Sequence, residues 1–534
     1  MKKRFTFFSL GVLGIIFFVL SITGFTSQAY QSGRNLYHEL ELFHSVLQTI
    51  QTNYVDEKEP HELVLHAING MISDLDPHTN YMTAEEFNQW NQRFEGYSGI
   101  GIYFDVLKDK ITVLSVIRGG PSEMIGLRAG DRIIAIDGES VIGIKRDDVP
   151  LKLMGPEGTQ VTITVERTGL KQPFTYTIIR KAIHLQSVPF SFVLKPDIGY
   201  INVTRFASTT EEEFGRALEK LEKEGINSLI IDLRNNGGGY MDAAVKMSDH
   251  FLPGGKRIVF TKGRIPDSYR EFYSTGRMTK RLYPVIIMQN RSSASASEIV
   301  AGALQDWDRG LIVGEASFGK GLVQSQFQFD DGSALLVTTA KYYTPTGRVI
   351  QRPYSDKSFE EYYTEVYSDT FNQANLDHTN QSEYKTMVLQ REVYGGGGIT
   401  PDVFLKADSD SISTILGRLV LSPKRLFFSF VQQYSKKNPE IGRDFNQFLA
   451  EYQPDTEALN SFYAYIQTEG FKMAREQFQE NLDDIRFMLK QHLAAAIWGE
   501  EARYKTQMLR DKQLVEAVTY LPRASELVKK AYGN

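Results

Sequence analysis

Apolar runs alternate with helical patterns between residues 185 and 350, and this alternation constrains the fold more than any other feature of the chain. The runs at Ser228–Leu233, Val285–Met288 and Leu311–Val313 are short and mostly apolar. Such runs are typical of strands that are buried on both faces of a sheet. Two further strand-like runs flank the turn Asp330–Gly332 and predict a hairpin. The segment is therefore predicted to be an α/β layer structure.

Two strand-to-helix junctions in this segment carry small loops that are rich in glycine or serine. One is Arg234–Gly239, and the other is the serine-rich stretch that contains Ser293, Ser295 and Ser297. Such junctions are common positions for active sites in open α/β sheets. A serine at the start of a helix also lies beside free backbone N–H groups, which can stabilise an oxyanion. The second junction is therefore a candidate site for a serine nucleophile.

A serine hydroxyl needs a base before it becomes a good nucleophile. Only His184 and His250 lie between residues 180 and 350, and both are interpreted as packing or surface residues. A lysine can serve instead if burial lowers its pKa toward the working pH. Lys320 lies in the glycine-rich loop Gly314–Gly321 beside a predicted buried strand, so it is the candidate base. The chain has no cysteine, which excludes disulfides, zinc thiolate sites and cysteine nucleophiles.

The same loop has a second interpretation, because Gly314 to Lys320 fits the beginning of a phosphate-binding loop. Such a loop continues with a serine or threonine that holds magnesium, and this chain has Gly321 there. The next segment, Leu322–Phe327, is strand-like where that loop needs a helix. Nucleotide binding is therefore not expected. Nucleic acid is not an expected partner either, because the net charge is −5 and no long basic run is present.

The N-terminus has the pattern of an export signal. Lys2, Lys3 and Arg4 precede an apolar stretch from Phe5 to about Phe25, and a small-x-small cleavage site follows at Ser27 to Ala29. The stretch is also near the length that spans a bilayer. Residues 1–29 are therefore interpreted as either an uncleaved signal anchor or a cleaved signal peptide. In both cases the rest of the chain is expected in the cell envelope on the periplasmic side, and an anchor would attach it to the inner membrane.

Residues 33–95 are predicted to be helical from the spacing of their apolar residues, and the period changes between residues 96 and 180. There, β-rich runs alternate with glycine turns, and the segments Tyr97–Ile102, Pro121–Asp131 and Ile133–Gly138 resemble a bacterial PDZ domain. The resemblance implies that the backbone at Gly99, Ile100, Gly101 and Ile102 binds the terminal carboxylate of a peptide, which then pairs with the adjacent strand. The alternative is that these glycines only shape a turn.

Five further segments complete a pattern with this domain. They are Asp76–Tyr81, Asp232–Gly239, Ser293–Ile299, Gly314–Gln324 and Gly395–Asp402. In this order, the chain resembles the C-terminal processing peptidases, or tail-specific proteases, of the S41 serine peptidase family, roughly over residues 35–350 with a further match at Gly395–Asp402. The resemblance implies an α/β multidomain protein: a helical cap, a PDZ domain and a ClpP/crotonase-like peptidase core over residues 185–408. It also implies a serine endopeptidase that acts on protein C-termini without a metal or cofactor.

The resemblance also assigns roles to residues. Ser295 matches the nucleophile, Lys320 the general base, and Gln324 the residue that orients the lysine. The backbone N–H groups of Ala296 and of Gly238 would form the oxyanion hole. The family often has proline where this chain has Gly237, so the choice of the glycine donor stays open. Ser293 and Ser297 are interpreted as helix-capping or packing residues.

The remaining parts carry less information. Residues 354–394 are interpreted as an insertion, and residues 409–534 as a helical extension whose apolar periodicity includes Ile485, Leu489 and Leu493. Self-association and docking of an adaptor protein are left open for the extension. A catalytically silent PDZ scaffold is the alternative function, and the joint presence of the three catalytic candidates argues against it. A crotonase-like acyl-CoA enzyme is disfavoured by the export signal and the PDZ pattern.

Overall fold

The computed structural model describes residues 36–276, 281–355, 357–368, 371, 378, 381–407 and 413–533. The proposed signal segment, residues 1–29, lies outside these residues. The chain divides into two compact units between Tyr81 and Met82, which are described separately. The first unit contains a helix over residues 36–53 and α2 (Pro60–Ser73), as the apolar spacing predicted. In the described part of the chain, no helix is both long and apolar enough to cross a bilayer.

The second unit begins with a helix and a small β domain. Strand β1 (Asn80–Met82) spans the boundary, and α3 (Ala84–Glu95) follows, capped reciprocally by Thr83 and Glu86. The elements of the β domain are β2 (Tyr97–Gly99), β3 (Ile102–Leu107), β4 (Lys110–Val116), α4 (Pro121–Met124), β5 (Arg132–Ile136), β6 (Glu139–Ser140), α5 (Val149–Leu153), β7 (Gln160–Glu166), β8 (Phe174–Ile179) and β9 (Lys181–Ile183).

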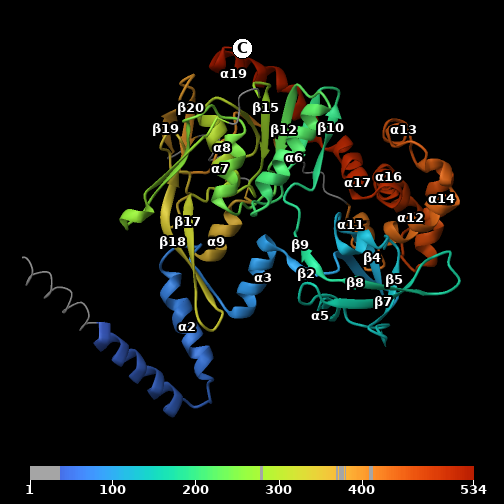
Figure 1. Cartoon of the computed structure of the whole chain (residues 1–534), viewed down its shortest axis with the longest axis horizontal. Coiled ribbons are helices and arrows are strands. Elements are labelled where there is room, and N and C mark those ends of the chain that lie inside the picture. Colours follow the sequence, from blue (N-terminus) through green and yellow to red (C-terminus); the bar gives the residue numbers. More distant parts are fainter. Residues whose placement is uncertain are drawn as a thin grey trace, which may run out of the picture. The chain divides into compact units, whose positions relative to one another are not determined.

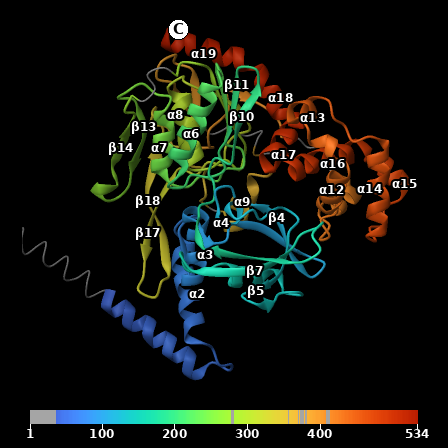
Figure 2. The same cartoon turned by 45° about the vertical axis from the view of Figure 1, so that its right-hand side comes forward.

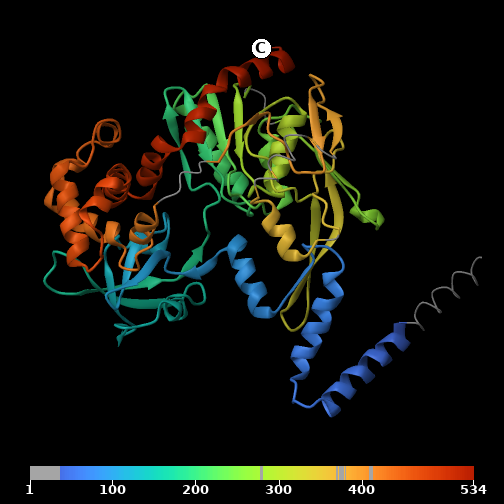
Figure 3. The same cartoon turned by 180° about the vertical axis from the view of Figure 1, so that it is seen from behind.

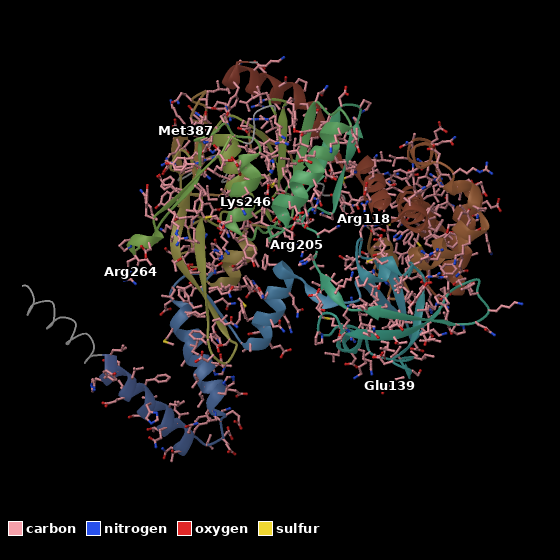
Figure 4. The ribbon with its side chains drawn as sticks, in the orientation of Figure 1. Arg118, Glu139, Arg205, Lys246, Arg264 and Met387 are labelled. Atoms are coloured by element: carbon pink, nitrogen blue, oxygen red, sulfur yellow. The ribbon has the colours of Figure 1, made fainter. Side chains whose placement is uncertain are left out.

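The sheet of this domain has the order β3-β4-β5-β7-β8, so β3 is an edge strand. Alternate residues of β7 face inward, and Val161, Ile163 and Val165 are buried in one apolar cluster with residues of the other strands. This alternation is the period-two pattern on which the sequence prediction rested. Glu139 of β6 lies at the outer surface of the domain (Figure 4).

The centre of the second unit is a six-stranded sheet with the order β10-β11-β12-β15-β16-β21 (Figure 1). Its strands are β10 (Phe190–Lys195), β11 (Ile198–Asn202), β12 (Ser228–Asp232), β15 (Val285–Gln289), β16 (Leu311–Gly314) and β21 (Val403–Phe404). All neighbours are parallel except β10 and β11. The three apolar runs of the sequence are the adjacent central strands β12, β15 and β16, as a sheet buried on both faces requires.

Helices cover both faces of this sheet. One face packs against α6 (Thr210–Lys223), α7 (Met241–Asp249) and α8 (Ala296–Asp306), and its strand residues include Ile231 and Ile287. The other face, which includes Ile230 and Ile286, packs against α18 (Lys512–Thr519) and α19 (Leu521–Tyr532) from the end of the chain (Figure 3). The core is thus a three-layer structure whose last layer comes from the predicted helical extension.

A second sheet adjoins the core and contains the predicted hairpin. It includes β13 (Arg257–Lys262), β14 (Arg270–Tyr273), β17 (Leu322–Gln328) and β18 (Ala334–Tyr343), and β17 and β18 form the hairpin (Figure 2). Along the chain, β18 is followed by α9 (Phe359–Glu365) and the strand pair β19 (Ser382–Lys385) and β20 (Glu392–Gly395) before β21 begins. They fall in the predicted insertion, 354–394, except that β20 ends one residue beyond it.

Most of the C-terminal extension forms a separate helical body. Its helices are α11 (Thr414–Val420), α12 (Leu426–Lys437), α13 (Phe445–Ala450), α14 (Thr456–Thr468), α15 (Arg475–Glu480) and α16 (Leu482–Trp498), followed by α17 (Glu500–Gln507). Ile485, Leu489 and Leu493 are buried on one side of α16, which confirms the helical periodicity. These helices share an apolar cluster of their own.

Candidate active site

Ser295 lies in the turn between β15 and α8, directly before the first residue of the helix. Its φ of 55° and ψ of −113° are unusual for a residue with a side chain, and such conformations cost on the order of 1–3 kcal/mol. Ser293 and Ser297, which flank it, are buried. The Ser293 hydroxyl donates to the carbonyl of Leu233 at 2.8 Å, and the Ser297 hydroxyl donates to the carbonyl of Asn236 at 2.8 Å. These two serines therefore fix the turn, and Ser295 is the half-exposed member of the three.

Lys320 and Gln324 are brought together by the loop between β16 and β17. The Lys320 Nζ donates to Gln324 Oε1 at 2.7 Å, and both side chains are half-buried. Gln324 lies on β17, which pairs with β18 along its length. The backbone of Gln324 is therefore held by a sheet, just after a shift of the strand register between Val323 and Gln324, and from there its side chain can orient the lysine amine.

Glu298 joins the serine turn to the lysine loop, and the sequence interpretation missed it. Its Oε2 accepts the backbone N–H of Ser295 at 2.7 Å and that of Lys320 at 2.9 Å. Its Oε1 accepts the Ser317 hydroxyl at 2.6 Å and the Gly319 N–H at 2.7 Å. One carboxylate thus sets the separation of the two backbones. The spacing Ser295-x-x-Glu298, typical of a helix start in which the acid reaches back to the residue before the helix, was the available signal.

Burial raises the pKa of Glu298 from 4.5 to about 7. The hydrogen bonds donated by Ser317, Lys320, Gly319 and Ser295 act in the opposite direction, because they favour the charged form. The carboxyl group therefore changes its charge near neutral pH. Its protonation would remove part of its capacity to accept these bonds.

The loop Arg234–Gly239 lies directly against the serine turn. A Cβ added to Gly238 would lie 2.7 Å from the carbonyl oxygen of Ala294, 2.8 Å from Cβ of Ser295 and 3.0 Å from the nitrogen of Ala296. With its φ of 97°, the position therefore requires glycine. In contrast, a Cβ on Gly237 would meet nothing within 4 Å. The proposed oxyanion donors, Gly238 and Ala296, are thus neighbours in space.

Asn236 holds this loop in place. Its side-chain Nδ2 donates to the carbonyl of Val203 at 2.8 Å, and its Oδ1 accepts the N–H of Gly238 at 2.9 Å. Its backbone carbonyl also accepts the N–H of Ala294 at 3.0 Å. The Gly238 N–H, expected to face the oxyanion, therefore already has a partner in this structure. Its role in an oxyanion hole stays a prediction.

Arg234 anchors the other end of the same loop. Its guanidinium donates to Asp232 Oδ2 at 2.6 Å and to Asp511 Oδ2 at 2.6 Å, so it connects β12 with the residue before α18. Burial works against the charge, but Asp232 and Asp511 together raise the pKa of Arg234. The Tyr200 hydroxyl donates to Asp232 Oδ2 at 2.7 Å. The C-terminal helices thus support the base of the loop beside Ser295.

The predicted peptide-binding residues lie at the edge of the small β domain. Gly99 ends β2 and Ile102 begins β3, while Ile100 and Ile102 are buried in the domain core. The carbonyl of Ile100 accepts the N–H of Ser122 at 3.1 Å, and Gly101 has a φ of 73°. Because β3 is an edge strand, its outer edge is suited to pairing with an added strand. The turn-shaping and peptide-binding interpretations of the glycines are both compatible with this geometry.

We found no arrangement suited to a metal ion among the side chains that the structure describes. Outside the gaps given above, no three His, Asp or Glu side chains between residues 36 and 533 converge in this way. Ser295 supplies a hydroxyl, and the hydrogen-bonded pair Lys320 and Gln324 supplies an amine and an amide. A serine hydroxyl and a neutral amine are the groups that base-assisted acyl transfer requires.

Family models match several parts of the chain. "Peptidase family S41" matches residues 197–356. "PDZ domain" matches residues 112–167, and "Activating protease CtpB N-terminal domain" matches residues 20–86. A family of unknown function matches residues 420–499, most of the separate helical body.

Known proteins are similar to this chain over about two thirds of its residues. A "Carboxy-terminal-processing protease" of Bartonella bacilliformis is 35% identical over 357 residues, which are 66% of this chain and 81% of that protein. A "Probable CtpA-like serine protease" of Staphylococcus epidermidis is 34% identical over 357 residues, or 65% of this chain and 72% of that protein.

Among solved structures, the photosystem II D1 C-terminal processing protease is similar at 27% identity and a TM-score of 0.35, covering 69% of this chain and 93% of that chain. The PDZ domain of a carboxy-terminal protease from Vibrio cholerae, solved in complex with a peptide, is 33% identical with a TM-score of 0.16. That match covers 17% of this chain and 98% of the Vibrio chain. The sequence relationships confirm the family resemblance. The chain belongs to peptidase family S41 as a serine-type carboxy-terminal-processing protease with a PDZ domain.

Proposed function

We propose that this protein is an endopeptidase of the cell envelope that cuts its substrates with a Ser295–Lys320 dyad after its PDZ domain has bound their C-termini. The observation that carries the proposal is the carboxylate of Glu298, which accepts the backbone N–H groups of both Ser295 and Lys320. The contact of Lys320 Nζ with Gln324 supports it further, because an oriented amine is what the reaction needs.

The reaction begins with neutral Lys320, which takes the hydroxyl proton of Ser295 as the serine oxygen attacks the scissile carbonyl. The backbone N–H groups of Ala296 and Gly238 stabilise the oxyanion. For Gly238 this means that its N–H leaves Asn236 Oδ1 and turns to the substrate oxygen. Lys320 then gives its proton to the leaving amine, and the C–N bond breaks. Water hydrolyses the acyl-enzyme, with the lysine again accepting and returning a proton.

Substrate selection would come from the β domain. The substrate's terminal carboxylate binds the backbone at Gly99 to Ile102, and its last residues pair with the outer edge of β3. Under this proposal the export signal directs the domain to the periplasmic side, where it meets exported proteins. An adaptor and a homo-oligomer remain compatible with it and are not needed for the chemistry.

Cleavage of a reporter protein with an apolar C-terminal tail tests this proposal. Wild type is expected to degrade the reporter, and Ser295→Ala and Lys320→Ala are expected to leave it intact. Ser292→Ala and Lys341→Ala are matched controls: the first alters a neighbouring serine of the same turn, the second an exposed lysine on β18. Activity should also fall as the pH is lowered, because a protonated lysine cannot accept the serine proton.

Three results would separate the alternatives. Cleavage by Ser295→Ala would show that the nucleophile is wrong. Binding of the tail by an inactive wild type would favour the scaffold alternative. Equal cleavage of reporters with a free and an amidated C-terminus would remove the role of the PDZ domain while leaving the dyad intact.

A further inference from the structure

The phenol of Tyr342 makes contacts that the reaction scheme does not yet use. Tyr342 lies near the end of β18, is 1% exposed, and belongs to the main apolar cluster of the core. Its hydroxyl lies 2.6 Å from the carbonyl oxygen of Lys320 and 3.1 Å from that of Ser295. A tyrosine has a single O–H group, so its hydrogen is shared between the two carbonyls.

These contacts complement those of Glu298. The carboxylate accepts the N–H groups of Ser295 and Lys320, and the phenol donates to the carbonyl groups of the same two residues. The two backbones are therefore joined twice, once through their donors and once through their acceptors. They come from different loops, since Ser295 precedes α8 and Lys320 precedes β17.

The phenol is not the only donor to the carbonyl of Ser295. The carbonyl of Ser295 also accepts the N–H groups of Glu298 and Ile299, as expected at the start of a helix. The backbone N–H of Tyr342 bonds the carbonyl of Gly321, directly after Lys320, at 2.9 Å. Strand β18 therefore holds the lysine loop through both its backbone and its side chain. The phenol then ties that loop to the serine turn.

We propose that Tyr342 is a positioning residue that sets the distance between the Ser295 hydroxyl and the Lys320 amine. The inference rests on the proposed dyad. A general base must lie within hydrogen-bond reach of the proton it takes, and a misplacement of about 1 Å can cost a hundredfold in rate. Burial also raises the pKa of Tyr342 well above its usual value, so the phenol stays a donor across the range of enzyme assays.

The test compares Tyr342→Phe with Tyr343→Phe. Each substitution removes one hydroxyl from β18, but the ring of Tyr343 stacks on Phe260 of β13, with 4.9 Å between the ring centroids. Peptide hydrolysis is measured well below both melting transitions, together with the rate at which a fluorophosphonate labels Ser295. Tyr342→Phe is expected to lower kcat and the labelling rate on the order of tenfold to a hundredfold, with little change in KM. Tyr343→Phe should stay within about twofold of wild type.

The acid side of the pH profile gives a readout that a purely structural role would not move. In Tyr342→Phe, we expect the pH at which activity falls on the acid side to differ from that of wild type, because the lysine amine loses its fixed place beside the serine. The positioning role would be overturned if Tyr342→Phe kept the wild-type kcat, or if both tyrosine variants lost kcat equally. In either case the proposed function stands as long as Ser295→Ala is inactive. Hydrolysis by Ser295→Ala would instead overturn the proposed function itself.

Discussion

Replacing Glu298 with glutamine should change how the stability of the core depends on pH. The folded protein raises the pKa of this group from 4.5 to about 7, so the folded state holds the proton more tightly than the unfolded state. The stabilisation from that proton is complete below about pH 4.5 and is lost as the pH rises through 7. At about 1.4 kcal/mol for each tenfold change in proton affinity, the loss is about 3 kcal/mol. The glutamine variant has no such titration.

The substitution also has a cost that does not depend on pH. Glutamine can keep its oxygen toward the N–H groups of Ser295 and Lys320, and its NH₂ group can donate to the Ser317 hydroxyl. The buried N–H of Gly319 then loses its acceptor, which costs about 1–3 kcal/mol. We therefore expect Glu298→Gln to fold and to be less stable than wild type at pH 4.5. Relative to wild type, it should gain about 3 kcal/mol between pH 4.5 and pH 8.

Urea unfolding at several pH values measures this difference. Both proteins carry Ser295→Ala to prevent self-digestion, and Trp90 and Trp498 are replaced by phenylalanine. The fluorescence of Trp307, which packs in the main core cluster, then reports on the core alone. Parallel stability curves between pH 4.5 and pH 8 would refute the reasoning, because they would mean that folding leaves the pKa of Glu298 unchanged.

Three other changes test the surroundings of the site. Gly238→Ala should abolish proteolysis in the reporter assay, because the added Cβ would collide with the serine turn. Gly237→Ala is its control and should keep near-wild-type activity, since a Cβ there meets nothing within 4 Å. Asp511→Ala should lower the unfolding free energy by at least about 2 kcal/mol, since Arg234 loses two charged hydrogen bonds; Trp307-monitored urea unfolding measures this. Asn236→Ala should lower both kcat and the melting temperature, and an unchanged kcat would mean that the loop keeps its shape without the amide.

The sequence allowed the central strands and the main candidates to be predicted for a physical reason. A buried parallel strand is a nearly continuous apolar run, and the loops that follow such strands gather at one edge of the sheet. Ser295 and Lys320 stand in two such loops, so the topology brings both to the same edge of the sheet. The helical periodicity of α16 was equally plain, because a helix that buries one side repeats every three to four residues.

Other features depend on pairings that no local pattern records. In the sequence, Tyr342 resembles any aromatic residue of a strand. Only the register of β18 places its hydroxyl beside the carbonyls of Ser295 and Lys320, which are far from it along the chain. Asn236 likewise holds the loop through Val203, which is far away in sequence. The periodicity of the extension identified its helices but not the surfaces on which they pack. The sequence therefore did not show that α18 and α19 form a layer of the peptidase core. Hydrophobic spacing shows that a face is buried, not what buries it.

The layer formed by α18 and α19 has a consequence for the order in which the enzyme becomes complete. During synthesis, the serine and lysine loops leave the ribosome well before the residues that cover the second face of the sheet and bind Arg234. The separate helical body is synthesised after the core strands and before α18 and α19. The core therefore lacks its last layer until the ribosome has passed through that body. We expect the growing chain to contain the catalytic groups without their support, and therefore to be unable to cut other proteins until the last helices have packed.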